Sequence, residues 1–309
     1  MRWGIFLTPL SSLCVYNLSC FMMKKSPVRV SLVIPVYNEE SHLAFCLDAI
    51  AKQTVKPFEV IVVDNNSTDQ TAVIARSYPF VRLLAETRQG VAYARDRGFN
   101  AARGEVIGRT DADTELAPNW IATIQRTFSN QHIQAASGVV DYRNIGLKSV
   151  FSTIDTYFRH FLAGRTSARG EVFLYGVNMA IRRTAWKKVR SEVCHERHFA
   201  EDLDLAAHLA EKQAGVIFEP NMIATIVPRQ AASDPHEFLK YVWSGPRTYA
   251  EHNLVSQRYM YPMAVFVTCV YVPIRLLYLG YDPELGRFSL PYLIHSETRA
   301  RVSPVSEFI

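Results

Sequence analysis

Short apolar runs alternate with helix-spaced apolar positions through the first half of the chain. Runs of strand length cover residues 30–34, 58–63, 81–85 and 105–109. Apolar residues at three- and four-residue spacing predict helices over residues 40–52, 69–78, 91–102 and 118–128. Strands that alternate with helices predict an α/β fold, with a mostly parallel sheet and helices on both of its faces.

The two ends of the chain break this alternation. Residues 1–23 begin with one arginine and then turn apolar, which fits a secretory signal peptide, a membrane-touching leader, or a start assigned upstream of Met23. Helical spacing returns over residues 233–253, and residues 259–281 are strongly apolar. We therefore expect an N-terminal leader over residues 1–27, disordered or membrane-touching, an α/β domain over residues 28–232, and a helical C-terminal extension over residues 233–309.

The apolar segment 259–281 contains Pro262, Pro273 and Arg275, which a clean spanning helix would lack. The segment is predicted to be an interfacial or a buried helix. A basic cluster further upstream either contacts anionic lipid or forms a solvated helix face. Its members are Arg182, Arg183, Lys187, Lys188 and Arg190. Peripheral membrane contact is therefore a hypothesis. Trp243, Arg247 and Tyr249 occur at core spacing, with a ligand-binding wall as the alternative.

Polar residues gather where three of the predicted strands end. These loops cover residues 35–40, 64–69 and 111–113. Ligands of such sheets bind beyond the carboxyl ends of the strands, so the loops should line one site. Asp111 and Asp113 form an Asp-X-Asp group whose two carboxylates can lean toward one divalent cation, Mn²⁺ or Mg²⁺, which would grip a diphosphate.

Two of these features also have ordinary structural explanations. Ser67 or Asp69 is expected to cap the following helix, which would leave Asp64 and Asn65 free to hydrogen-bond a base or ribose. Arg95 lies in a helix with many small residues, and either a surface salt bridge or a contact with phosphate or base would explain it.

The composition of the chain limits the classes of binding partner and the cellular setting that can be expected. The chain has 309 residues with a formal net charge of +5, which suits a nucleotide, a phosphorylated lipid or a membrane surface. It has no long basic run interleaved with aromatics, so nucleic acid is not expected. The 5 cysteines are scattered and form no Cys-X-X-Cys pair, which favours a reduced, cytoplasmic setting, with the cytoplasmic face of a membrane as a variant of it.

The segments 34–40, 62–69, 90–98 and 111–113, in this order and spacing, resemble the nucleotide-binding half of family 2 glycosyltransferases with the GT-A fold, a Rossmann-like sheet. The resemblance implies a nucleotide-sugar donor and a divalent metal. It implies that Pro35, Tyr37 and Glu39 surround the base and ribose, and that Asp64 and Asn65 read the nucleoside. It also implies that Asp111 and Asp113 hold the ribose and the metal, with Asp113 the surer metal ligand.

The second half matches the family more loosely. Residues 174–182 are similar to the family's acceptor-side strand, where the turn at Gly176 and Asn178 approaches the donor sugar. The family places its catalytic base in a Glu-Asp pair at a helix start. Asp202 is therefore the candidate base, with Glu201 supporting it or binding the acceptor, and Asp204 is a weaker competitor. A single carboxylate base implies one displacement with inversion.

Some residues depart from the family pattern. Asn65 and Asp96 stand where relatives more often have Asp and Asn, and the Gln-X-X-Arg-Trp motif of processive synthases is missing, which indicates a non-processive enzyme. Relatives often complete the metal site with a later histidine. Here Arg229 either binds diphosphate or faces solvent, and His236 is a candidate late ligand.

The sequence leaves three functions open. The first is an inverting glycosyltransferase with a saccharide or lipid-linked acceptor, in cell-envelope polysaccharide or glycolipid synthesis. The second is a nucleotidyltransferase. Such an enzyme is expected to have a glycine-rich phosphate loop after the first strand, but residues 35–40 contain no glycine. The third is a non-catalytic nucleotide-sugar binding module.

Overall fold

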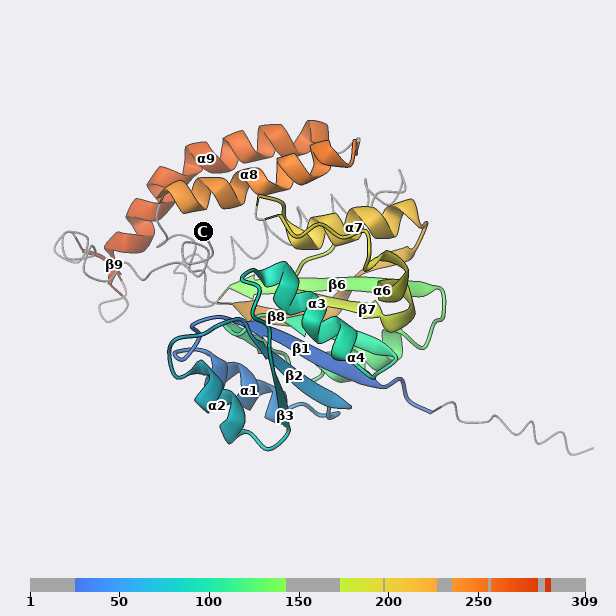
Figure 1. Cartoon of the computed structure of the whole chain (residues 1–309). Helices are drawn as coiled ribbons and strands as arrows, with labels where there is room; N and C mark the ends of the chain where they lie inside the picture. The colour runs from blue at the N-terminus through green and yellow to red at the C-terminus, as the bar shows by residue number, and fades with distance from the viewer. Residues whose placement is uncertain are drawn as a thin grey trace, which may run out of the picture.

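The computed structural model describes residues 26–142, 173–196, 198–226, 235–254, 257–282 and 287–289. Within these ranges, eight strands form one sheet in the order β3-β2-β1-β4-β7-β6-β8-β5 (Figure 1). The strands of this sheet are β1 (Val30–Val36), β2 (Glu59–Asp64), β3 (Val81–Ala85), β4 (Val106–Thr110), β5 (Thr114–Leu116), β6 (Ile133–Tyr142), β7 (Asn178–Arg182) and β8 (Gly215–Ile226). A separate small ladder pairs β9 (Tyr281–Asp282) with β10 (Arg287–Phe288).

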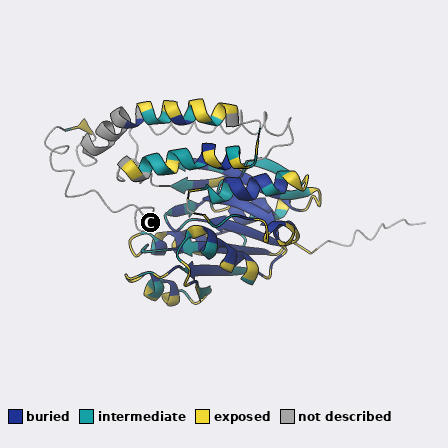
Figure 2. Cartoon of the chain, turned by 45° about the horizontal axis from the view of Figure 1, so that its top comes forward, coloured by how far each residue is buried: buried dark blue, intermediate teal, exposed yellow. Residues whose placement is uncertain are grey.

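The helices cover both faces of the sheet, as the strand pattern predicts. They are α1 (Leu43–Ala51), α2 (Thr71–Ser77), α3 (Val91–Ala101), α4 (Trp120–Thr127), α6 (Arg183–Val189) and α7 (Glu201–Glu211). Successive residues of β1 point to opposite faces, so Leu32 and Ile34 pack in the core beneath α1, α2 and α4, while Val33 packs beneath α3, α6 and α7. Figure 2 shows the strands as the buried centre of the molecule.

Strands β3, β2, β1 and β4 are all parallel, so their carboxyl ends share one edge. The other half of the sheet is mixed: β7 runs antiparallel to both β4 and β6, and β5 runs antiparallel to β8. Since β6 and β8 are also parallel, the expected mostly parallel sheet is confirmed, with antiparallel pairs confined to the second half. The reversal has a consequence for the site, because β7 starts beside the end of β4, where Asn178 pairs with Thr110.

Helix α3 lies unusually close to the sheet at Gly98. A Cβ atom at this position would come within 2.3 Å of Val33 Cγ1 and 3.0 Å of Val63 Cγ2. Only glycine allows this approach, which brings the first turn of α3 over the carboxyl ends of β1 and β2 (Figure 1).

The expected C-terminal helices are α8 (Pro235–Glu251) and α9 (Gln257–Gly280), which lie side by side above α7 (Figure 1). Tyr249 is buried as expected of a core residue, Trp243 is half-buried, and Arg247 is exposed. Helix α9 carries exposed aromatic side chains, among them Tyr259, Tyr261 and Phe266. No helix in the described ranges is long and apolar enough to cross a bilayer.

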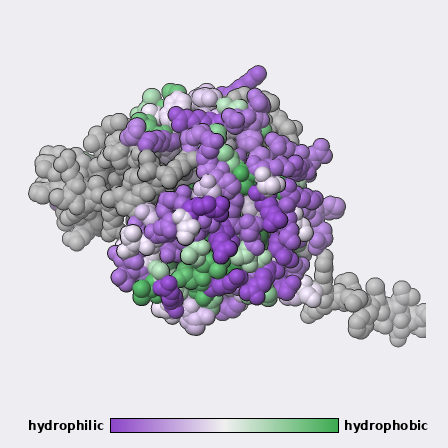
Figure 3. All heavy atoms as spheres, viewed as in Figure 1, coloured by the Kyte–Doolittle hydropathy of each residue, from purple (hydrophilic) through white to green (hydrophobic). Residues whose placement is uncertain are grey.

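The surface facing the viewer in Figure 1 is mostly hydrophilic, with an apolar area over its lower part, where α2 and β3 lie (Figure 3). The basic cluster predicted around α6 is only partly a surface feature. Arg182 is buried and donates to the carbonyl oxygens of Phe128, Asn130 and Ile133, so its expected contact with lipid or solvent is wrong. Lys187, Lys188 and Arg190 are exposed.

Candidate active site

Hydrogen bonds join the loops that follow β1 and β2. The Asn38 backbone N–H donates to Ser67 Oγ at 3.1 Å, and the Thr68 N–H donates to Asn38 Oδ1 at 2.8 Å. Asn38 adopts a left-handed backbone conformation with φ of 50°, which asparagine tolerates better than most residues. The two loops therefore form one braced unit at the carboxyl edge of the sheet.

The same loops are joined again one residue further on. The Glu39 N–H donates to Thr71 Oγ1 at 2.7 Å, and the Glu40 N–H donates to Asp69 Oδ2 at 3.1 Å. Asp69 Oδ1 also accepts the Thr71 N–H at 2.9 Å, so Asp69 satisfies a backbone donor at the start of α2. Ser67, the other predicted cap, bonds Asn38 instead. These contacts explain why the helices begin later than the sequence predicts.

Asp64 and Asn65 follow β2 but have different environments. Asp64 is half-exposed, and its Oδ1 accepts the Ser67 N–H at 3.1 Å. Asn65 is 1% exposed, and its side chain bonds the Glu86 and Arg88 carbonyl oxygens and the Gly90 N–H. The expectation that Asn65 is free to read a nucleoside is therefore wrong: it fixes the loop that leads into α3.

Carboxylates gather beyond the ends of β1 and β4. Partial desolvation by the surrounding protein raises the pKa of Asp111 to about 6, and the negative charges of Asp113, Glu201 and Glu39 add to the rise, against the opposing charge of Arg109. Burial, Asp113, Asp111 and Glu39 likewise raise the pKa of the Cys46 thiol. Asp111, Asp113 and Glu39 therefore act on one small region, and this excess of negative charge suits a cation.

This donor set fits a divalent ion that is shared with a substrate. Asp111 and Asp113 supply hard carboxylate oxygens, and the Asp111 side chain is 41% exposed, so it is accessible from solvent. Mg²⁺ and Mn²⁺ are commonly held by one or two carboxylates, with substrate phosphates completing the shell. Among the described residues, the groups of three metal-ligating side chains lie elsewhere, on and near α7, so Asp111 and Asp113 would depend on such phosphate ligands.

A buried ladder of charges connects β4, α7 and α3. Arg109, on β4, contacts Asp111 at 3.3 Å through Nη2 and binds Glu201 through Nη1. Glu201 takes its second partner from α3, because Arg95 Nη1 lies 2.5 Å from Glu201 Oε2. Both arginine side chains are almost fully buried, at 3% and 0% exposed.

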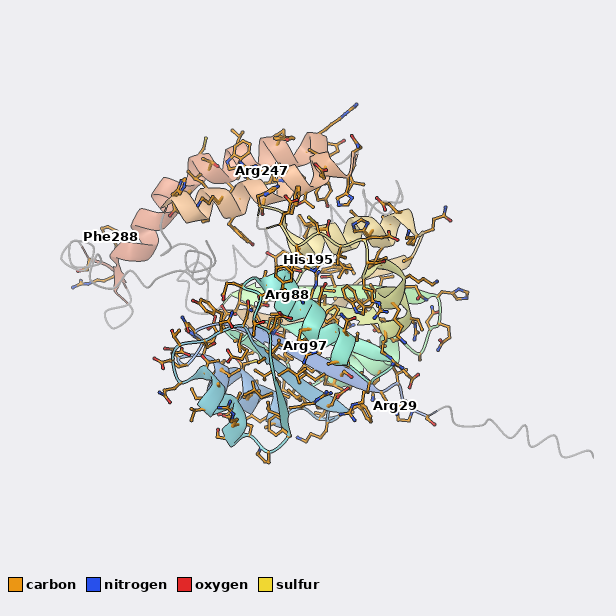
Figure 4. All side chains as sticks on the ribbon, viewed as in Figure 1. Arg29, Arg88, Arg97, His195, Arg247 and Phe288 are labelled. Carbon is orange, nitrogen blue, oxygen red and sulfur yellow. The ribbon has the colours of Figure 1, made fainter. Side chains whose placement is uncertain are left out.

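Arg95 is not where either sequence interpretation placed it. It is fully buried, so the surface salt bridge is wrong, and its guanidinium bonds Glu201 and Asp96. The ladder continues outward from Asp96 to His195 Nε2 at 2.9 Å, and the His195 ring stacks on Tyr93. Figure 4 shows His195 and Arg88 near the start of α3.

Glu201 and Asp202 are neighbours with opposite electrostatics. Burial alone would raise the pKa of Glu201, but Arg109 and Arg95 outweigh it and hold this pKa below its usual value. Burial raises the pKa of Asp202, and the charge of Glu201 adds to the rise. Asp202 is half-exposed, whereas Glu201 is locked between two arginines. Asp202 is therefore the stronger base of the two.

Gly176 positions Asp202 through its backbone. Its N–H donates to Asp202 Oδ2 at 2.9 Å, and Oδ1 accepts the Leu203 N–H at 2.9 Å. A Cβ atom on Gly176 would come within 2.6 Å of Arg109 Nη1. The turn before β7 thus lies directly against the charge ladder, as the antiparallel pairing of β7 with β4 requires.

Asn178 does not belong to the accessible site. Its side chain is fully buried, accepts from Trp120 Nε1 at 2.8 Å, and donates to the Val139 and Met222 carbonyl oxygens. The predicted contact with a donor sugar is therefore wrong, since every polar atom of this amide is used inside the sheet. Asp204, the weaker candidate base, is also buried and binds the Cys194 N–H and His252.

The remaining predicted residues differ in position. Pro35 lies near the carboxyl end of β1 and Tyr37 in the loop after it, both half-exposed, and Glu39 is nearly buried. His236 is exposed in the first turn of α8, and Arg229 lies outside the described residues. Sequence reasoning missed Arg109. The available signal was that Arg109 is the only charged residue of β4.

Parts of the chain are similar in sequence to known bacterial glycosyltransferases. The chain is 31% identical over 124 residues to YibD, an uncharacterized glycosyltransferase of Escherichia coli. The aligned region covers 39% of this chain and 36% of YibD. The chain is 26% identical over 187 residues to the glycosyltransferase GlyG of Streptococcus pneumoniae, covering 55% of this chain and 60% of GlyG. The matches therefore span less than two thirds of these relatives.

Solved structures support the fold. A mannosyltransferase of Pyrobaculum calidifontis, in complex with GDP-Man and Mn²⁺, superposes with a TM-score of 0.58 at 20% identity, covering 89% of this chain and 80% of that one. A glucosyl-3-phosphoglycerate synthase of Mycobacterium tuberculosis gives a TM-score of 0.52 at 17% identity, covering 74% and 81%. Together with the sheet order, these matches confirm the expected GT-A fold.

The sequence profile of one family, glycosyl transferase family 2, matches residues 31–190. The match begins in β1 and extends through the loops after β1 and β2, the Asp-X-Asp group and the Gly176 turn. It covers just over half of the 309 residues, so the chain belongs to glycosyl transferase family 2.

Proposed function

We propose that this protein transfers a sugar from a nucleoside diphosphate donor to an acceptor hydroxyl, with inversion at the anomeric carbon. The observation that carries the proposal is the juxtaposition of Asp202, Arg109 and Asp111. Asp202, a carboxylate with a raised pKa, and Asp111 of the Asp-X-Asp group both act electrostatically on the same buried arginine, Arg109, and Asp111 contacts it at 3.3 Å.

The roles follow from the contacts. Asp202 takes the proton from the acceptor hydroxyl as its oxygen attacks the anomeric carbon, and Gly176 holds the carboxylate in place. A divalent cation held by Asp111 and Asp113 would offset the charge that builds on the departing diphosphate. Arg109 and Arg95 keep Glu201 ionised and fixed, so Glu201 supports the base or orients the acceptor.

The nucleoside is expected to lie over the braced loops. Pro35, Tyr37 and Asp64 are partly exposed there, and Asp64 keeps an oxygen that is not used by the Ser67 N–H. Arg95 becomes a positioning residue for Glu201 instead of a nucleotide contact. A saccharide or lipid-linked acceptor, in the synthesis of cell-envelope polysaccharide or glycolipid, remains the proposed second substrate.

A panel of nucleotide-sugar donors tests the function, with and without Mn²⁺. Release of nucleoside diphosphate that needs Mn²⁺ is expected, and Asp202→Asn should lower kcat by about 10²–10⁴-fold, the usual contribution of a general base. Asp48→Asn, an exposed change on α1 that keeps an acceptor for the Tyr78 hydroxyl, is the matched control and should leave kcat unchanged.

Other outcomes of the same panel point elsewhere. Pyrophosphate in place of nucleoside diphosphate would indicate a nucleotidyltransferase, and donor binding without release would indicate a binding module. Equal turnover of Asp202→Asn and Asp48→Asn would remove Asp202 as the base. The configuration of the product linkage, measured by NMR, decides between inversion and retention.

We also propose peripheral membrane contact through α9, at the cytoplasmic face. Its supporting observation is the exposure of Tyr259, Tyr261 and Phe266 on one helix, at 39%, 40% and 61%. Sedimentation with anionic vesicles tests it. Binding that is lost in Phe266→Asp supports the contact, and the absence of any binding by the unaltered chain rejects it.

A further inference from the structure

A second cluster of metal-ligating side chains lies at the junction of α7 and α8, away from the Asp-X-Asp group. Asp204 and His208 are one helical turn apart on α7, and His252 directly follows the last turn of α8. One ligand atom from each of the three side chains lies within 4.8 Å of the others. The three side chains are only 4%, 13% and 11% exposed, so the cluster is shielded from solvent.

The distances within the cluster match those expected around one ion. His252 Nε2 is 3.0 Å and His208 Nε2 is 3.7 Å from the same oxygen, Asp204 Oδ1. Ligands about 2.0–2.1 Å from a tetrahedral zinc ion stand roughly 3.3 Å apart, which lies between these two values. The other carboxylate oxygen, Asp204 Oδ2, accepts the Cys194 N–H at 2.8 Å, and this contact aims Oδ1 at the two rings.

The far side of each ring faces another carboxylate. Glu211 Oε2 lies 3.3 Å from His208 Nδ1, and Glu211 Oε1 lies 3.5 Å from His252 Nδ1. Metal-bound histidines commonly donate their free ring N–H to a carboxylate in this way, which fixes the tautomer. When Glu211 accepts both Nδ1 protons, each neutral ring turns an Nε2 lone pair toward the Asp204 oxygen, a repulsive arrangement unless a cation lies between them.

We propose that Asp204, His208 and His252 bind one divalent transition-metal ion of the zinc type, with Glu211 orienting both imidazoles. Imidazole nitrogens with one carboxylate are a ligand set that suits zinc. The site would join α7, which carries Asp202 in its first turn, to the end of α8. The alternative is a metal-free cluster in which Nε2–H of each ring points at Asp204 Oδ1, with the two ring centroids 4.8 Å apart.

The test begins with metal-free full-length chain, purified without a histidine tag and titrated with Zn²⁺ against a chromophoric chelator. One zinc ion per chain is expected. The Asp111→Asn/Asp113→Asn double variant should bind zinc equally well, because its changes lie at the other site. His208→Gln and His252→Gln should each weaken binding by 10-fold or more, whereas His132→Gln, an exposed residue outside the cluster, should not.

Two readouts use the unaltered chain and do not depend on how the variants fold. Zinc should raise the thermal midpoint by roughly 5 °C at a hundredfold excess over its dissociation constant. Zinc should also protect His208 and His252, but not His132, from diethylpyrocarbonate, as mapped by mass spectrometry. The proposal is overturned if the chain binds no stoichiometric zinc, or if His208 and His252 react in the metal-free chain and zinc leaves their modification unchanged.

Discussion

At the scale of single residues, the informative contrast is between Glu201 and Asp202. Adjacent in sequence, they have pKa values shifted in opposite directions, because two arginines surround one carboxylate while burial and a neighbouring negative charge act on the other. Pairs of acids separated in this way are typical of sites that need one fixed charge and one proton acceptor. The pair therefore supports the division of roles proposed above.

The first prediction concerns pH. Only ionised Asp202 can accept a proton, so kcat/KM should fall as the pH is lowered through its pKa. Since that pKa is raised, the acidic limb should lie above the value of about 3.9 that is usual for aspartate. Initial rates at saturating Mn²⁺ across this range measure it. A limb at or below the ordinary value would contradict the raised pKa.

The second prediction concerns Gly176. In Gly176→Ala the new methyl group would press on Arg109 and disturb both Glu201 and Asp202. Because misplacement of catalytic groups by about 1 Å can cost 10²-fold in rate, kcat should fall by about 10–100-fold while KM for the donor changes little. Steady-state kinetics measure kcat and KM, and a thermal melt shows whether the variant is folded. Wild-type kcat in a folded variant would show that the turn can move freely.

The place of a residue could be predicted where it depends only on the adjacent strand or helix in the sequence. Asp111 and Asp113 follow a strand, and Glu201 and Asp202 begin a helix, so their approximate places could be predicted. Asn178 could not, because its partners Trp120 and Met222 are 58 and 44 residues away. Contacts between such distant segments depend on the order of strands in the sheet, which the local pattern does not contain.

At the scale of elements, the close approach of α3 to the sheet gives the third prediction. Gly98→Ala would place a methyl group against Val33 and Val63, and overpacking of this kind costs about 1–3 kcal/mol of unfolding free energy. Urea denaturation measures it. Arg97→Ala, on the exposed side of the same helix, is the control and should change stability by no more than about 0.5 kcal/mol. Equal midpoints for both variants would contradict the tight packing.

The sequence pattern predicted the first four strands and their helices but missed β5, β6 and β8. Strand β6 contains small and polar residues, including Gly138, whose added Cβ would lie 2.0 Å from the Met222 carbonyl oxygen. Strand β8 contains Pro220, and its pairing with β6 shifts register after Gly138. Strands held by close backbone approach and irregular pairing do not show the regular apolar alternation on which the predictions rest.

At the scale of the whole molecule, Asp202 links function to stability. A carboxyl whose pKa is raised on folding contributes stability that is present at low pH and is lost as the pH rises through that pKa. Asp202→Asn cannot ionise. The fourth prediction is therefore that the thermal midpoint of Asp202→Asn, measured relative to that of the wild type, rises as the pH is raised from about 4 to about 8. Thermal melts across this range measure it, and a gap that narrows with rising pH would contradict it.

The overall architecture was predictable in its class but not in its full topology. Alternating strands and helices correctly indicate α/β layers, while the antiparallel insertion of β7 beside β4 follows from no local signal. The division of the chain at residue 232 stays a prediction. The helices beyond it are present as α8 and α9.

The bracing of the loops after β1 and β2 has an evolutionary consequence. These loops are tied to each other through Asn38, Glu39 and Glu40, whereas Glu201 is held by arginines from α3 and β4. Under the proposed function, substitutions of exposed residues in these loops can alter which nucleoside is accepted, as long as Asn65 continues to fix the loop that leads into α3. Donor preference should diversify among descendants of this chain faster than the stereochemistry of transfer.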